Sequence, residues 1–138
     1  MIYTSSQYLL DASAIYPLVL RLRKKFLEYA DRFTVLDLTI YEVGNALWKE
    51  YRLGRIRDLA TVAKLFEFIL GSIRVLRLGT EIHNVLDLAV SENLTFYDAS
   101  YLYMARVHGM KLVTEDQDLL RYPEAVNTEK LLQELQAK

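Results

Sequence analysis

The chain has 138 residues, a net charge of −1 and no cysteine. Its length, with 52% hydrophobic and 25% charged residues, fits one soluble globular domain, residues 1–138, and excludes the disordered and fibrous classes. The absence of cysteine excludes disulfides and thiolate metal sites, and a charge near zero leaves any attraction to polyanions to local basic clusters.

No membrane-crossing segment is expected, because the unbroken apolar runs are only a few residues long. Met1 to Gln7 also lack the basic stretch and apolar core of a signal peptide. A chain without cysteine fits a reducing compartment. We therefore expect a cytoplasmic protein without membrane contacts.

The first quarter of the chain predicts two strands and two helices. Tyr8 to Leu10 form a short apolar run that ends at Asp11, which is typical of a buried strand with an acid at its tip. A helix is expected from Ser13, its N-cap, to Leu20, and a second from Arg21 to Asp31. Phe33 to Leu36 are short, apolar and partly β-branched, which indicates the second strand.

Two further helices follow. Thr39 and Glu42 match the Ser/Thr-x-x-Glu capping box, and Gly54 is expected to close the helix that they begin. The predicted helix from Arg57 to Leu70 is apolar around much of its circumference, which indicates deep burial or a partner surface. The apolar stripe of the first of these helices comprises Ile40, Val43, Leu47 and Tyr51.

The second half of the chain continues the alternation of strands and helices. Alternation of this kind predicts an α/β fold with a mostly parallel sheet of about five strands and helices on both faces. Ligands of such sheets bind beyond the carboxyl ends of the strands. The expected strands are 73–76, 111–113 and 125–126, and the expected helices are 80–91, 95–108 and 128–136.

Four acids stand at predicted strand ends or helix starts. Asp11 follows the first strand, Asp116 follows the strand 111–113, and Glu42 and Asp98 lie near the starts of helices. Because carboxylates are the ligands that Mg²⁺ and Mn²⁺ prefer, convergence of the four predicts a metal site acting on a phosphate ester. Each acid taken alone could instead cap a helix, and capping and ligation are compatible.

Other polar residues near these acids are weaker candidates. Ser13 and Thr114 could bind phosphate or water through their hydroxyl groups, although hydrogen bonding within a turn is the simpler role. Asp118 could be an additional ligand or a polar turn residue. His83 and His108 have no partner at metal-ligand spacing and are expected to be ordinary helix residues.

Four segments in order carry a resemblance to a known family: Leu10 to Ser13, Tyr41 to Leu47, Tyr97 to Tyr101, and Leu112 to Asp116. The sequence resembles PIN-domain proteins, and among them the VapC ribonuclease toxins of toxin–antitoxin pairs. The resemblance implies an α/β/α sandwich and metal-dependent cleavage of RNA with Mg²⁺ or Mn²⁺. It also implies a homodimer and a VapB-like antitoxin partner. Carried over by position, the four family acids are Asp11, Glu42, Asp98 and Asp116, and Asn45 stands where the family often has a polar residue.

The functional hypothesis is therefore a metal-dependent endoribonuclease, with catalytic and metal-binding roles for Asp11, Glu42, Asp98 and Asp116 and substrate-binding roles for Ser13, Asn45 and Thr114. Alternatives are a PIN-type RNA-processing nuclease without an antitoxin and a non-catalytic protein-binding module whose acids only cap helices. A phosphoacceptor switch is disfavoured, since the sequence has no second acid close to an acceptor Asp and no Lys after a late strand in convincing positions.

Overall fold

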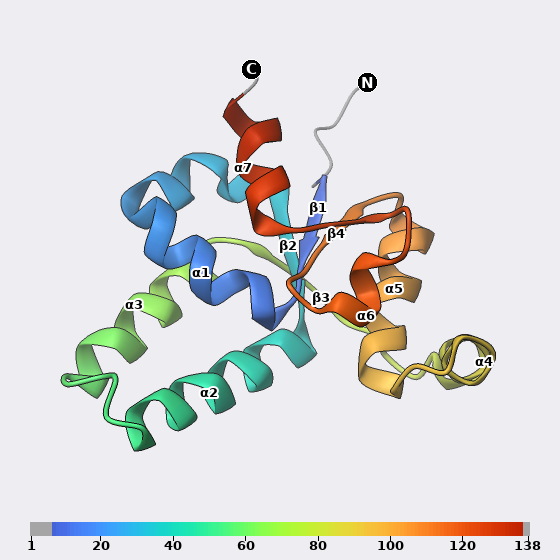
Figure 1. The fold of residues 1–138 in the computed structure, drawn as a ribbon, viewed down its shortest axis with the longest axis horizontal. Helices are drawn as coiled ribbons and strands as arrows, with labels where there is room; N and C mark the ends of the chain where they lie inside the picture. The colour runs from blue at the N-terminus through green and yellow to red at the C-terminus, as the bar shows by residue number, and fades with distance from the viewer. Residues whose placement is uncertain (1–6, 137–138) are drawn as a thin grey trace.

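The computed structural model describes residues 7–136, so the signal-peptide expectation for Met1 to Ser6 lies outside the described residues. Five parallel strands form one sheet in the order β3-β2-β1-β4-β5, which confirms the α/β prediction (Figure 1). The register pairs Tyr8 with Phe33 on one side of β1 and with Lys111 on the other. The strands are β1 (Tyr8–Leu10), β2 (Phe33–Leu36), β3 (Arg74–Leu76), β4 (Lys111–Val113) and β5 (Ala125–Val126).

Helices cover both faces of this sheet, with α1, α3 and α7 on one side and α4 and α5 on the other (Figure 1). Alternate residues of β1 enter different cores: Tyr8 and Leu10 pack in one and Leu9 in the other. The structure is therefore the expected three-layer sandwich. The helices are α1 (Ala12–Leu22), η1 (Arg23–Arg32), α2 (Asp37–Arg52), α3 (Leu59–Gly71), α4 (Ile82–Glu92), α5 (Phe96–His108), α6 (Gln117–Leu120) and α7 (Thr128–Gln136).

The strand order creates a switch point between β1 and β4. From β1 the chain first adds β2 and β3 on one side, and later adds β4 and β5 on the other. The crossovers on the two sides therefore diverge beyond the carboxyl ends of β1 and β4. Asp11 directly follows β1, and Thr114 to Asp116 follow β4, so the fold brings both segments to this point.

Two predictions about the first helices are wrong. Helix α1 begins at Ala12, and its N-cap is Asp11 rather than Ser13, because Asp11 Oδ1 accepts a hydrogen bond from the Ala14 amide at 3.1 Å. The second helix is the 3₁₀ helix η1, which starts at Arg23 with a positive φ of 51°. Of η1 only Phe26 is buried, while Tyr29 and Ala30 are partly buried against the core, so few apolar contacts support this helix.

The predicted start and apolar stripe of α2 also need correction. The helix begins at Asp37, and Thr39 Oγ1 accepts a hydrogen bond from the Leu36 amide at 3.1 Å, so the capping box with Glu42 is wrong. The buried residues of α2 are Thr39, Val43 and Leu47, whereas Ile40 and Tyr51 are 44% and 48% exposed. The last turns of α2 extend beyond the body of the sheet (Figure 1).

Helix α3 is not deeply buried. Only Phe66 and Ile69 are buried, and Phe68 on the same helix is 62% exposed. Of the two interpretations of its broad apolar surface, the structure excludes deep burial. Within residues 7–136, no helix combines the length and the apolar character needed to cross a membrane.

Candidate active site

All four predicted acids line a single pocket of about 520 Å³. They come from different parts of the fold: Asp11 caps α1, Glu42 is on α2, Asp98 is in the first turn of α5, and Asp116 caps α6. The pocket lies at the switch point of the sheet. Its lining residues are Asp11, Ala12, Ser13, Leu38, Tyr41, Glu42, Asn45, Tyr97, Asp98, Tyr101 and Asp116.

Asp11 is the most buried of the four acids, with 6% of its surface exposed. Burial raises its pKa from the ordinary 3.8 to about 6, and the nearby Glu42 charge also raises it. Hydrogen bonds from the Ser13 hydroxyl, the Thr114 hydroxyl and the Ala14 amide act in the opposite direction. The carboxyl group is thus held firmly in position but is costly to ionise.

The two hydroxyl groups predicted to bind substrate both contact Asp11. Ser13 Oγ donates to Asp11 Oδ1 at 2.6 Å and accepts from the Glu115 amide at 2.9 Å. Thr114 Oγ1 donates to Asp11 Oδ2 at 2.6 Å and accepts from the Asp116 amide at 3.0 Å. Thr114 is completely buried, whereas Ser13 is exposed and lines the pocket. The hydroxyl of Thr114 therefore links the Asp11 carboxylate to the loop that carries Asp116.

Glu42 is positioned by a buried tyrosine that the sequence analysis did not identify. Tyr101 Oη donates to Glu42 Oε1 at 2.6 Å and lies 2.8 Å from Thr39 Oγ1. Tyr101 is 2% exposed, and burial together with its bond to Glu42 raises its pKa well above the usual value. Its position three residues after Asp98 puts both side chains on one face of α5, a spacing that could have revealed it.

Asp98 carries the least compensated charge of the pocket. Burial raises its pKa, followed by the charges of Asp116, Glu42 and Asp118. Half of a capping box forms at the start of α5: Thr95 Oγ1 accepts a hydrogen bond from the Asp98 amide at 3.0 Å, but no hydrogen bond to the Asp98 carboxylate occurs among residues 7–136. This carboxylate is thus left available for another ligand.

Asp116 does cap a short helix, because its Oδ1 accepts from the Asp118 amide at 2.9 Å. Asp118 itself does not line the pocket, although its charge affects Asp98. Neither histidine takes part in the site. His83 pairs with Asp87 on the surface of α4, and His108 is exposed at the end of α5.

The donor atoms of the pocket suit a hard divalent cation. Four carboxylates and Asn45 supply oxygen ligands, and no Lys, Arg or His side chain is among the lining residues. In the described part of the chain, however, no three acidic or histidine side chains are close enough together to hold an ion as they stand. Binding would therefore require carboxylates such as Asp98 to turn toward a common point.

Comparison with known proteins gives consistent matches along nearly the whole chain. The sequence model of the PIN domain matches residues 8–125. The chain is 44% identical over 133 residues to Exonuclease VapC9 of Pyrobaculum aerophilum, covering 96% of this chain and 98% of that protein. It is 34% identical over 117 residues to Ribonuclease VapC3 of the same organism, covering 79% and 88%.

Two solved structures share the fold. The crystal structure of PAE2754 from Pyrobaculum aerophilum is 44% identical, with a TM-score of 0.88 and coverage of 97% of this chain and 92% of that one. A toxin–antitoxin complex from Klebsiella pneumoniae has a TM-score of 0.63, with coverage of 87% and 96%. At 19% identity the second likeness concerns the fold alone.

Proposed function

This chain belongs to the PIN-domain family, and from this premise we propose that it is a metal-dependent endoribonuclease that hydrolyses RNA phosphodiester bonds. The pocket that Asp11, Glu42, Asp98 and Asp116 line at the switch point is the observation that carries the proposal. The names of the two Pyrobaculum relatives, an exonuclease and a ribonuclease, support nuclease chemistry.

We assign Asp11, Glu42, Asp98 and Asp116 as the residues that hold Mg²⁺ or Mn²⁺. When bound, such an ion lowers the pKa of water and offsets charge on the phosphate. The carboxylates repel one another and the RNA, since two unit charges 4 Å apart interact by about 4 kcal/mol at an effective dielectric constant of 20. Burial and the charges of the neighbouring acids raise the pKa of Asp98, so a cation bound beside it would stabilise its charged form.

The other polar side chains have supporting roles in this proposal. Ser13 and Thr114 hold the two oxygens of Asp11, and Tyr101 holds one oxygen of Glu42, so three hydroxyl groups orient these two acids. Asn45 lines the pocket one helical turn from Glu42 and can donate a hydrogen bond to RNA. Thr114 acts on Asp11 rather than on RNA, because it is completely buried.

Cleavage of an end-labelled RNA tests the proposal. The wild type, Asp98→Asn and the control Asp31→Asn, an exposed acid of η1, are each incubated with Mg²⁺, Mn²⁺ or excess chelator. We expect metal-dependent cuts that Asp98→Asn abolishes and Asp31→Asn retains. Equal cutting by Asp98→Asn, or no cutting by the folded wild type with either ion, would refute the assignment.

A circular single-stranded RNA separates endonuclease from exonuclease action, which matters because one relative is named an exonuclease. A circle has no ends, so only an endonuclease linearises it. We expect a full-length linear product to appear first. An intact circle, under conditions that degrade the linear RNA, would reassign the enzyme as an exonuclease.

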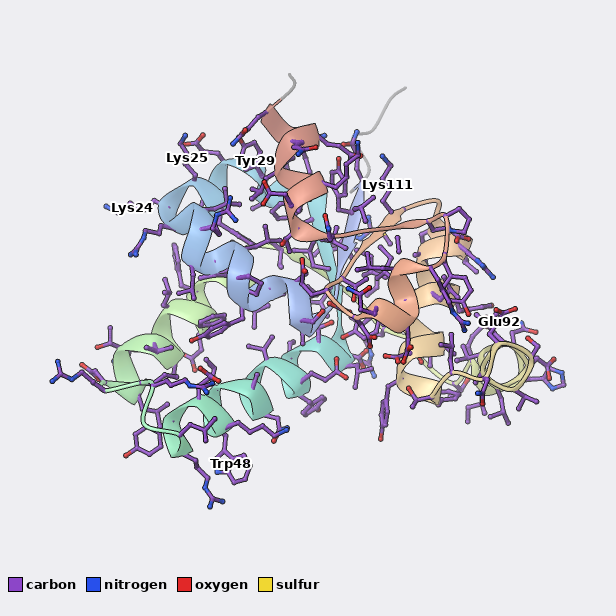
Figure 2. The ribbon with its side chains drawn as sticks, in the orientation of Figure 1. Lys24, Lys25, Tyr29, Trp48, Glu92 and Lys111 are labelled. Atoms are coloured by element: carbon purple, nitrogen blue, oxygen red, sulfur yellow. The ribbon has the colours of Figure 1, made fainter. Side chains whose placement is uncertain are left out.

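We further propose that the protein is the toxin of a toxin–antitoxin pair and forms a homodimer, as in VapC proteins. The surface between α1, η1 and α3 supports a protein contact, since a pocket of about 500 Å³ there is lined by apolar residues such as Leu27 and Phe68. Lys24 and Lys25 also line this pocket, and Figure 2 shows them at the start of η1. Light scattering of the purified chain tests the dimer, and growth arrest relieved by co-expression of a neighbouring gene tests the antitoxin.

A further inference from the structure

Three hollows follow one another along α2, and the acidic pocket is the middle one. The first, of about 290 Å³, is lined by the start of α2 and by Arg77. The acidic pocket is lined by α2 residues from Leu38 to Asn45. The third, of about 330 Å³, is lined by Trp48, Lys49, Arg52 and Leu53 near the end of the helix. Cationic side chains thus flank the carboxylates along the helix axis, Arg77 on one side, in a hollow that Asp37 also lines, and Lys49 and Arg52 on the other.

Exposed aromatic rings line each of these hollows. Tyr41 and Tyr97 line both the first hollow and the acidic pocket, and they are 76% and 59% exposed. Trp48 in the third hollow is 51% exposed, and Figure 2 shows it pointing away from the body of the molecule. Single exposed apolar residues are ordinary on protein surfaces. An ordered series beside a candidate active site is not explained by that general rule.

The residues concerned share one face of α2. At 3.6 residues per turn, Tyr41, Asn45, Trp48 and Arg52 fall within a sector of about 60°, and Trp48 lies about 10 Å along the axis from Tyr41. The guanidinium group of Arg52 lies 5.1 Å from the centroid of the Trp48 ring. Rings, an amide and a cation therefore alternate along a straight strip of surface, which we call the α2 strip.

We propose that the α2 strip and Tyr97 bind unpaired nucleotides of the RNA on both sides of the scissile bond. Bases stack on Tyr41 and Tyr97 beside the carboxylates and on Trp48 farther along, while Arg77 at one end and Lys49 and Arg52 at the other contact phosphates. This inference rests on the proposed nuclease function, and it adds the conformation and path of the substrate. A strand held on both sides of the acids is placed for an internal cut.

The negative charge of the acidic pocket limits how RNA can bind beside it. The acidic pocket repels a polyanion, so substrate binding needs attraction that carboxylates do not cancel. Base stacking on aromatic rings is such an interaction, and it tolerates any base because every base has a π-face. Bases in a duplex are already paired and stacked on each other, so they are not free to stack on Tyr41 or Trp48. The strip therefore selects single-stranded segments by conformation rather than by sequence.

A protein partner is the competing occupant, because exposed aromatic and arginine residues are also enriched at protein interfaces. Two observations favour RNA. Two of the rings, Tyr41 and Tyr97, line the pocket that carries the acids, and Arg77 at one end and Lys49 and Arg52 at the other are placed where phosphates would follow. A protein interface remains an outcome that the experiment below detects.

Fluorescence gives a direct test, because Trp48 is the only tryptophan of the chain. The Asp98→Asn variant is used because it should not cleave the RNA. It is titrated in the presence of Mg²⁺ with a single-stranded RNA and with the same RNA annealed to its complement. We expect the single strand to quench Trp48 emission to saturation and the duplex to quench it little. Equal quenching by both, or quenching that follows protein concentration instead of RNA, would overturn the proposal.

Two variants measure the contribution of the rings. Tyr41→Leu and Trp48→Leu keep apolar bulk but remove the aromatic face, and the loss of one stacked base should weaken RNA binding about tenfold. Trp48→Leu should raise KM with little change in kcat, since it is remote from the acids. Tyr51→Leu, on the same helix α2, is the matched control, because Tyr51 is 48% exposed and does not line any of the three hollows.

The result separates this inference from the proposed function. If the wild type cleaves RNA and both variants cleave with the wild-type KM, the strip is not the binding surface although the nuclease assignment stands. If the wild type cleaves nothing but single-stranded RNA quenches Trp48, the strip is supported as a binding surface while the nuclease assignment fails.

Discussion

Replacing Asp11 with Asn should stabilise the metal-free protein while abolishing cleavage. The folded state raises the pKa of Asp11 from 3.8 to about 6, mainly because the side chain is buried. The folded protein therefore binds the proton more tightly than the unfolded chain, so its stability falls as pH rises from about 4 to about 6 and stays low above that range. The free energy of unfolding that the protein loses by ionising Asp11 amounts to about 1 kcal/mol at pH 4.5 and about 3 kcal/mol at pH 7.5.

Asparagine removes the charge but keeps the shape. Its oxygen can still accept from Ser13 and Ala14, and its amide group can donate to Thr114 Oγ1 in place of the present bond. The variant should thus avoid most of this loss. For a chain of 138 residues a gain of about 3 kcal/mol corresponds to a rise in Tm of about 10 °C.

Urea unfolding followed by circular dichroism in excess chelator measures this difference. The free energy of unfolding of Asp11→Asn should exceed that of the wild type clearly at pH 7.5 and only slightly at pH 4.5, whereas Asp31→Asn should follow the wild type at both. Added Mg²⁺ should reduce the gap, because it binds the wild type only. A variant that is less stable than the wild type at both pH values would refute the reasoning from burial.

Further predictions concern the metal, the tyrosine behind Glu42, and the core. Mg²⁺ at 100 times its dissociation constant should stabilise the wild type by about 2.7 kcal/mol in thermal melts, and Asp98→Asn should lose this stabilisation. Equal stabilisation of both proteins would mean that the ion binds elsewhere. Tyr101→Phe should change stability by only about 1 kcal/mol but raise the Mg²⁺ concentration for half-maximal cleavage about tenfold, because Glu42 loses the hydroxyl that orients it. An unchanged metal requirement would leave Tyr101 a purely structural residue. Leu9→Ala, in the completely buried centre of β1, should cost about 2–5 kcal/mol in urea unfolding, with the exposed Leu53→Ala as a nearly neutral control.

The strands could be predicted from the sequence because each is a short apolar run beside a polar residue. Tyr8 to Leu10 and Lys111 to Val113 have the expected bounds, and Asp11 directly follows the first of them. Helix α5 also has the expected end, since Gly109 adopts a φ of +64° after His108. Alternation of strands and helices then implied a parallel sheet.

Helix starts and buried faces were less predictable, because they depend on contacts made elsewhere in the fold. Ser13 has the side chain of an N-cap, yet its hydroxyl bonds to Asp11 and accepts from the Glu115 amide, a residue brought near only by the pairing of β1 with β4. Thr39 likewise bonds to the Leu36 amide and lies beside Tyr101 instead of capping a helix with Glu42. Local pattern rules cannot anticipate such long-range partners.

The same limit applies to the candidate site. The positions of the acids along the sequence predicted which carboxylates would line one pocket, since each lies near the end of a strand or the start of a helix. They did not predict how the acids are held, because the hydroxyl groups of Thr114 and Tyr101 reach Asp11 and Glu42 across 103 and 59 residues of sequence. The candidate acids can be recognised from local sequence patterns, whereas the residues that orient them are set by the tertiary structure.

The arrangement around Asp11 explains why a site of this kind needs rigid support. A carboxylate with 6% of its surface exposed, close to the charge of Glu42, would relax toward solvent or hold its proton if nothing constrained it. Two hydroxyl groups and one amide fix its oxygens, and they come from the start of α1 and the end of β4 on both sides of the switch point. The short strands β1 and β4, paired in register, thus hold the Asp11 carboxylate at the pocket where we propose that a cation binds.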